Sequence, residues 1–170
     1  MEYNKYLREE TCCFTGHRSS KLPWGSNERD WRCKDLKDRI ASTIECVYSE
    51  GVRHFICGMA IGCDMYFAEA VISLRLCKPD ITLEAAIPCE GQDLRWSRQL
   101  SERYDRLLAE CDIRTLVSRA YTPDCMMRRN RYMVDSSGLI IAVFDGAPGG
   151  TLNTLRYAFR AGLKIIELEP

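Results

Sequence analysis

The chain has 170 residues, 46% of them hydrophobic, which predicts a single domain spanning residues 1–170 with its core between about 11 and 168. Its 24 basic residues balance 24 acidic ones, so no global charge draws it to nucleic acid or to an anionic membrane.

The first half of the chain alternates apolar runs with segments of helical period. "TCCFT" (residues 11–15) is a compact apolar run that predicts a strand. Residues 27–50 then place apolar side chains at three- and four-residue spacing, which predicts an amphipathic helix. "RHFIC" (53–57) and residues 63–77 repeat this order, and the second helix is expected to bury Met65, Ala68, Ile72 and Leu76.

The second half continues the alternation. "ITLEAAI" (81–87) precedes a helix with its apolar face at Leu100, Tyr104, Leu107 and Cys111. "IRTLV" (113–117) precedes a helix over 123–136, which Pro123 opens without losing a hydrogen bond. "GLIIAVF" (138–144) is typical of a strand buried on both faces. Residues 150–161 predict a helix that buries Leu152, Leu155 and Phe159, and "LKIIEL" (163–168) predicts the last strand.

Six strands alternating with five helices predict an α/β fold. Parallel neighbours need crossover connections, so we expect a Rossmann-like three-layer sandwich, with a mostly parallel sheet of about six strands and helices on both faces. Ligands of such sheets bind beyond the carboxyl ends of the strands, where the strand order reverses. The residues that directly follow strands are therefore the candidates for a site.

Four predicted strands end in turns that contain glycine: Thr15–Arg18, Gly58–Asp64, Pro88–Gln92 and Asp145–Thr151. Three of them lead to helices, and two, Gly58–Gly62 and Gly149–Thr151, end at helix N-termini. The first N–H groups of a helix lack partners, and glycine lets a phosphate approach the backbone closely. We therefore expect a phosphate-bearing ligand where these turns converge. The alternative is that the glycines at 58 and 62 only permit tight packing of strand against helix. Neither turn is a Walker loop or a dinucleotide fingerprint.

Polar side chains near these turns are candidate ligand contacts. Asp64, in the first turn of its helix, suits either capping of free N–H groups or acceptance from a ribose hydroxyl. Arg18 suits bidentate binding of a phosphate, and His17 is either a ligand contact or an ordinary loop histidine. Arg129 and Asn130 are expected at the same edge, because their helix runs against the strands.

Five motifs, taken together, resemble a known family. They are "CFTGHR", "GMAIGCDMYFAE", "PCEGQDLRW", "RRNRYMVDSS" and "AVFDGAPGGTLNTLRYA". In order and spacing they resemble the YpsA-like family of the SLOG superfamily, bacterial cytosolic Rossmann-like proteins grouped with LOG-type nucleotide hydrolases and DNA-processing protein A. The resemblance covers residues 11–168 and implies binding of a nucleotide or of an ADP-ribose-like or NAD-like ligand, without an established reaction.

The resemblance and the strand-end argument select the same ligand-binding positions. They are Thr15, Gly16, His17, Arg18, Gly58, Ala60, Gly62, Asp64, Gln92, Arg129, Asn130, Asp145, Gly149, Gly150 and Thr151. LOG-type hydrolases carry Pro-Gly-Gly-x-Gly-Thr-x-x-Glu. Here the second glycine-threonine pair and the catalytic glutamate are missing after Pro148–Gly150, which argues against hydrolysis by that mechanism.

Three functions are compatible with these patterns. We favour binding or sensing of a nucleotide or ADP-ribose-like ligand, which requires no cofactor and no catalytic residue. The second is hydrolysis of an N-glycosidic or phosphate bond, with Asp64, Glu69 or Glu90 as general acid or base. The third is binding of single-stranded DNA along Arg95, Arg98, Arg103 and Arg106, against which the interleaved acidic residues argue.

The compartment follows from what the chain lacks. "MEYNKYLREE" has no signal-peptide apolar run, and no later segment approaches the roughly 18–20 apolar residues of a membrane span. The ten cysteines lie mostly in apolar segments, so we interpret them, Cys46 and Cys77 included, as reduced core thiols rather than as disulfides or a zinc site. We expect a cytoplasmic protein without bound metal, a homo-oligomer being compatible with the sequence.

Overall fold

The computed structural model describes residues 6–170 and contains all six predicted strands and all five predicted helices. The strands are β1 (Thr11–Gly16), β2 (His54–Cys57), β3 (Thr82–Ile87), β4 (Ile113–Leu116), β5 (Leu139–Val143) and β6 (Lys164–Leu168). The helices are α1 (Trp31–Ser49), α2 (Cys63–Arg75), α3 (Arg98–Glu110), α4 (Cys125–Asp135) and α5 (Gly150–Arg160). The structure also contains two short 3-10 helices, η1 (Arg8–Glu10) and η2 (Ser19–Lys21).

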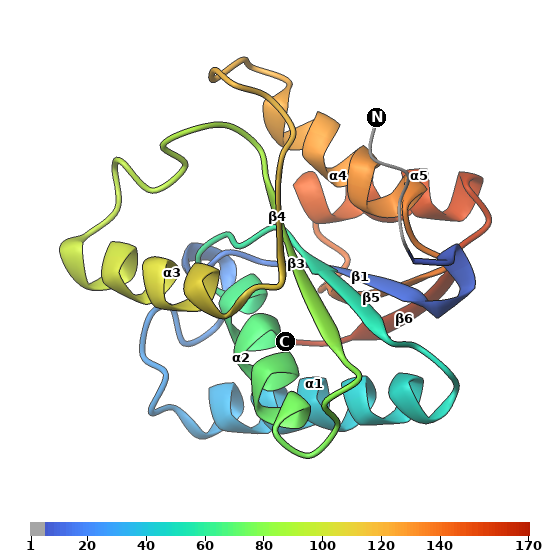
Figure 1. Cartoon of the computed structure of the whole chain (residues 1–170). Helices are drawn as coiled ribbons and strands as arrows, with labels where there is room; N and C mark the ends of the chain where they lie inside the picture. Colours follow the sequence, from blue (N-terminus) through green and yellow to red (C-terminus); the bar gives the residue numbers. More distant parts are fainter. Residues whose placement is uncertain (1–5) are drawn as a thin grey trace.

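The strands form one parallel sheet in the order β4-β3-β2-β1-β5-β6. From β1 the chain steps outward on one side through β2, β3 and β4, and then returns to place β5 on the other side of β1. Helices α1, α2 and α3 cover one face of the sheet, and α4 and α5 cover the other (Figure 1). The Rossmann-like prediction is confirmed, and the strand order reverses between β1 and β5.

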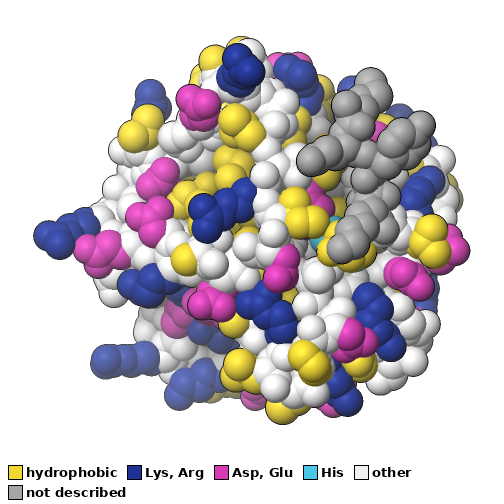
Figure 2. Space-filling model, viewed as in Figure 1, with side chains coloured by type: hydrophobic (Ala, Val, Ile, Leu, Met, Phe, Trp, Pro, Cys, Tyr) yellow, Lys and Arg dark blue, Asp and Glu magenta, His cyan; other side chains and the backbone are white. Residues whose placement is uncertain are grey.

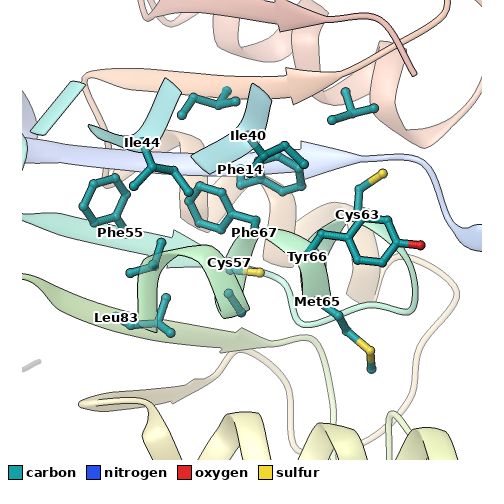
Figure 3. Close-up of a cluster of buried hydrophobic side chains, with 14 of the residues drawn as sticks. Phe14, Ile40, Ile44, Phe55, Cys57, Cys63, Met65, Tyr66, Phe67 and Leu83 are labelled. Carbon is teal, nitrogen blue, oxygen red and sulfur yellow. The ribbon is translucent and has the colours of Figure 1, made fainter. Parts of the chain in front are cut away.

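Buried aromatic side chains hold the central strands against α2. Phe14 of β1 stacks on Phe67 of α2 with ring centroids 4.5 Å apart, and Phe55 of β2 meets Phe67 edge-on at 6.1 Å (Figure 3). On the other face, Ile56 and Ile140 pack in a second cluster with residues of α4 and α5. As predicted, β5 is buried along its whole length. The strand ends that carry the site therefore project from a packed core.

Several local predictions were wrong at the ends of helices. The first helix begins at Trp31 rather than near residue 27, because the carboxylate of Asp30 caps it by accepting the Arg32 N–H at 2.9 Å. Leu76 is 85% exposed because it lies just past the end of α2. Phe159 is 77% exposed, since α5 turns Leu155 and Ala158 toward the sheet instead.

The cysteines are all free, but two of them are not core residues. Cys46 and Cys77 are exposed, whereas the other eight are buried or partly buried. Most of them therefore pack as small apolar side chains. Within residues 6–170, no helix is long and apolar enough to cross a membrane.

Candidate functional site

A pocket of about 240 Å³ lies at the switch point, beyond the carboxyl ends of β1 and β5. We call it the strand-edge pocket. Its walls come from β1 and the turn after it, the turn before α2, α4 and the start of α5. The lining residues are Phe14, Thr15, Gly16, His17, Arg18, Ser20, Lys21, Ala60, Asp64, Met126, Arg129, Asn130, Met133, Gly150 and Thr151.

Most of the predicted ligand-binding residues meet in this pocket. Thr15, Gly16, His17, Arg18, Ala60, Asp64, Arg129, Asn130, Gly150 and Thr151 line it. The other five do not line it: Gly58, Gly62, Gln92, Asp145 and Gly149. Each of these five lies beside a residue that does line it, or beside the backbone that shapes it.

Arg129 brings a buried positive charge to the pocket. Its guanidinium donates to the carbonyl of Gly58 and, at 3.5 Å, to that of Ala86, while its Nε donates to Asn130 Oδ1 at 2.8 Å. Arg129 is only 6% exposed, and its guanidinium forms no direct ion pair with a carboxylate of residues 6–170. Burial lowers the pKa of Arg129, and the charge of Asp64 opposes that shift.

The glycines of the second turn serve packing, the alternative that the sequence left open. A Cβ on Gly58 would overlap the Arg129 guanidinium and lie 2.9 Å from Asp64 Oδ2. A Cβ on Gly62, whose φ is +100°, would lie 2.7 Å from the backbone N of Ser19 and 2.8 Å from the carbonyl of His17. Side-chain and backbone atoms of the protein therefore occupy the space beside both glycines. Gln92 also contacts this turn, donating to Met59 O at 2.8 Å.

Asp64 stabilises the same turn from within α2. Its Oδ2 accepts the backbone N–H of Ala60 at 3.1 Å. The carboxylate therefore binds an N–H group of the turn before α2, where the sequence predicted that it would cap N–H groups of the helix. Burial raises the pKa of Asp64, while the charge of Arg129 and the Ala60 N–H act against that rise. Asp64 lines the strand-edge pocket.

His17 joins the two strands at the switch point. Its Nε2 lies 2.8 Å from Asp145 Oδ1, which also accepts the N–H of Ala147 at 2.9 Å. The Ala147 N–H, and then the His17 ring, hold the pKa of Asp145 below its usual value. His17 therefore ties the turn after β1 to the turn after β5, and its ring also forms part of the pocket wall.

The start of α5 is the open wall of the pocket. Its N-cap is Gly149, which supplies no capping side chain, and a Cβ built on Gly150 would meet no atom within 4 Å. Asn130 fixes this wall relative to α4 by donating to Thr154 Oγ1 at 2.8 Å. Free N–H groups and the positive end of the helix dipole favour an anion at such a position.

Two exposed cations flank the open wall. Arg18, which was predicted, forms no hydrogen bond or ion pair through its side chain within the described chain. Lys21, which was not predicted, reaches across to the carbonyl of Pro148 at 3.5 Å. The signal for Lys21 was the long irregular segment that follows β1, because long loops in compact domains often carry function.

Only one of the three candidate acids of the hydrolase hypothesis reaches the pocket. Asp64 lines it, whereas Glu69 pairs with Arg103 at 2.7 Å on the far side of α2 and Glu90 is exposed outside the pocket. The described residues bring together no group of three or more His, Cys, Asp or Glu side chains able to hold a metal ion.

The arginine strip of the DNA hypothesis is interrupted by acidic partners. Arg103 binds Glu28 and Glu69, and Arg98 pairs with Glu102 at 2.7 Å. Figure 2 shows basic and acidic side chains intermixed on the face of the molecule that carries α3 and β4. This face therefore presents no continuous track for a phosphate backbone.

Comparisons with known proteins agree with this architecture. The family model YpsA, described as "YspA SLOG family", matches residues 12–161. The chain is 34% identical over 136 residues to the "Uncharacterized SPbeta prophage-derived protein YoqJ" of Bacillus subtilis, covering 72% of this chain and 80% of that one. It is 25% identical over 119 residues to a UPF0398 protein of Bacillus pumilus, covering 69% of this chain and 62% of that one.

A solved structure shares the fold. DNA processing protein A (DprA) from Streptococcus pneumoniae superposes with a TM-score of 0.59 at 13% sequence identity, over 94% of this chain and 50% of that one. The chain thus spans about half of DprA and less than two thirds of the B. pumilus relative.

Proposed function

The chain belongs to the YpsA family of SLOG proteins, as its motifs indicated. From this membership and from the strand-edge pocket, we propose that the protein binds a nucleotide through the phosphate of that nucleotide. The family and the shared fold support a nucleotide-related or DNA-processing role. Binding of an ADP-ribose-like ligand is the finer form of the proposal. Its support is a pocket that joins phosphate-binding groups to a carboxyl group suited to ribose.

The observation that carries the proposal is the buried guanidinium of Arg129. The nearby charge of Asp64 stabilises it without forming a direct ion pair, and a buried charge is unfavourable unless its partners compensate it fully. Arg18 and Lys21 add two further positive charges at the rim, while Asp64 is the one acidic residue of the described chain that lines the pocket. A phosphate there would neutralise these cations and accept the free N–H groups of α5.

Calorimetric titration tests the proposal. ADP-ribose, NAD, AMP and ATP are titrated into the protein and into the variant Arg18→Gln/Lys21→Gln. At least one ligand should bind the parent, and the variant should bind it about tenfold or more weakly, since two charged contacts are lost. Arg29→Gln, an exposed arginine outside the pocket, is the matched control. Absence of binding of every ligand at millimolar concentration would refute the proposal.

A hydrolase is the second candidate because Asp64 is a buried carboxyl group that lines the pocket, and burial raises its pKa. A buried carboxyl group of this kind is suited to hold a proton for a leaving group. Incubation of the same ligands with the parent and with Asp64→Asn, followed by chromatography, separates this candidate from simple binding. Products formed by the parent and not by the variant would support it, and unchanged ligands over a range of pH would exclude it.

A further inference from the structure

A second cavity continues the strand-edge pocket along the surface between α4 and α5. It measures about 460 Å³ and shares Met126, Asn130 and Gly150 with the first pocket. We call it the α4–α5 groove. The strand-edge pocket alone is smaller than the roughly 300–1,000 Å³ of typical small-molecule sites. A nucleotide held there by its phosphate therefore has to extend, and the groove is contiguous with the pocket.

The groove is basic. Arg131 of α4 and Arg156 and Arg160 of α5 line it, and no acidic residue among residues 6–170 does. Arg156 and Arg160 form no hydrogen bond or ion pair within residues 6–170, so both guanidinium groups are available to a ligand. At four residues apart they lie on one side of α5.

An aromatic surface accompanies these charges. The Tyr157 ring lines the groove, and the Arg131 guanidinium lies over it at 5.5 Å from the ring centroid. The hydroxyl of Tyr157 donates to Asp135 at 2.9 Å, which fixes the orientation of the ring. Aromatic side chains beside arginines suit nucleobases next to phosphates.

The arginines stand at a defined distance from the first phosphate site. With a rise of about 1.5 Å per residue, Arg156 lies ~9 Å and Arg160 ~15 Å along the helix axis from Gly150. A nucleoside 5'-monophosphate with its phosphate at Gly150 has no second anionic group to place near these arginines. A ligand with a second phosphate beyond its first nucleoside does.

On these grounds, and resting on the proposed function, we infer that the ligand carries two separated phosphate groups, one in the strand-edge pocket and one at Arg156 and Arg160 in the α4–α5 groove. The class is a nucleotide extended by a further phosphate or nucleotide unit. A 3',5'-bisphosphate of one nucleoside and a 5'-phosphorylated dinucleotide share this chemistry.

The test compares affinities for adenosine 5'-monophosphate, adenosine 3',5'-bisphosphate and 5'-phosphorylated diadenylate. The parent should bind at least one of the two extended ligands about tenfold or more tightly than the monophosphate, and the tighter of the two identifies the source of the second phosphate. In Arg156→Gln/Arg160→Gln this gain should fall below twofold. Arg119→Gln/Arg128→Gln removes the same charge from exposed positions outside the groove and should keep the gain.

The outcomes separate the two proposals. Binding of the monophosphate with no gain from either extended ligand overturns the inference and leaves the proposed function standing. A gain that persists in Arg156→Gln/Arg160→Gln, or that is lost equally in the control, also overturns it. If the parent binds none of the three ligands, the proposed function fails and the inference fails with it.

Discussion

The guanidinium of Arg129 occupies the space that a side chain at position 58 would need, and it donates to the carbonyl of Gly58 itself. One glycine thus admits a charged group from a helix that begins far along the chain. The contact sets the position of Arg129 at the back of the strand-edge pocket.

Gly58→Ala should therefore lower both stability and ligand binding. The added methyl group displaces Arg129, and overpacking of this kind costs about 1–3 kcal/mol. Urea denaturation measures the loss. Gly150→Ala is the matched control, since a Cβ there meets open space and its stability should change by less than about 0.5 kcal/mol. Equal stability of the two variants would contradict the proposed role of Gly58.

Gly150→Val should separate binding from folding. The branched side chain fills the junction of the strand-edge pocket and the α4–α5 groove, so nucleotide affinity should fall at least about tenfold with little loss of stability. Ile141→Ala, in the fully buried β5, should do the reverse: it should cost about 2–5 kcal/mol while the folded fraction still binds. Calorimetry and urea denaturation of both variants check this, and unaltered affinity of the valine variant would count against the site.

Asp64→Asn should change how stability depends on pH. Burial raises the pKa of Asp64 in the folded state, so the folded protein holds a proton that the unfolded chain releases above about pH 4. The free energy of unfolding contributed by this group therefore falls as pH rises from that value. Relative to the parent without ligand, the variant should gain stability as the pH rises above about 4. A pH-independent difference between their denaturation curves would show that Asp64 does not titrate in this way.

Tyr132→Phe should lower stability more at neutral pH than in acid, because the Tyr132 hydroxyl stabilises the ionised carboxylate of Glu84. Burial alone would raise the pKa of Glu84, but hydrogen bonds from His54, Tyr132 and Thr115 outweigh it and lower the pKa. This carboxylate therefore stabilises the fold above about pH 4.3 and loses that effect as pH falls. Removing the Tyr132 hydroxyl should cost about 1.5–3 kcal/mol at pH 7 and less in acid.

The control for this variant is Tyr157→Phe, whose hydroxyl bonds the exposed Asp135. Its stability should change by less than about 0.5 kcal/mol at both pH values. A loss in Tyr132→Phe that is equal at pH 7 and in acid would show that Glu84 is not the group responsible.

The fold was predictable because its strong signals are local. Apolar runs and helical periodicity located every strand and helix, and β5 was recognised as a buried strand from its composition alone. Helix ends were less predictable, since one cap decides them. Because the side chain of Asp30 caps α1, the helix begins later than its apolar periodicity predicted. Leu76 lies beyond the end of α2 although it continues the apolar pattern of that helix.

The position of the pocket was predictable from topology, but not the purpose of each glycine. A glycine that admits a ligand and one that admits Arg129 look alike in sequence, because the contact joins residues 71 positions apart. Gly150 faces open space, whereas Gly58 does not. Lys21 was missed because irregular loops have no periodicity from which to infer the direction of a side chain.

The pairing of β1 with β5 also has a kinetic consequence. The His17–Asp145 bond closes a loop of 128 residues, and the entropy of such a closure costs about 4 kcal/mol before any contact across it is made. Parallel contacts this distant in sequence are expected to form late in folding. The walls of the strand-edge pocket are therefore expected to meet only after most of the sheet exists. A ligand bound there would act mainly by slowing the unfolding of the folded protein and would contribute little to the rate at which it folds.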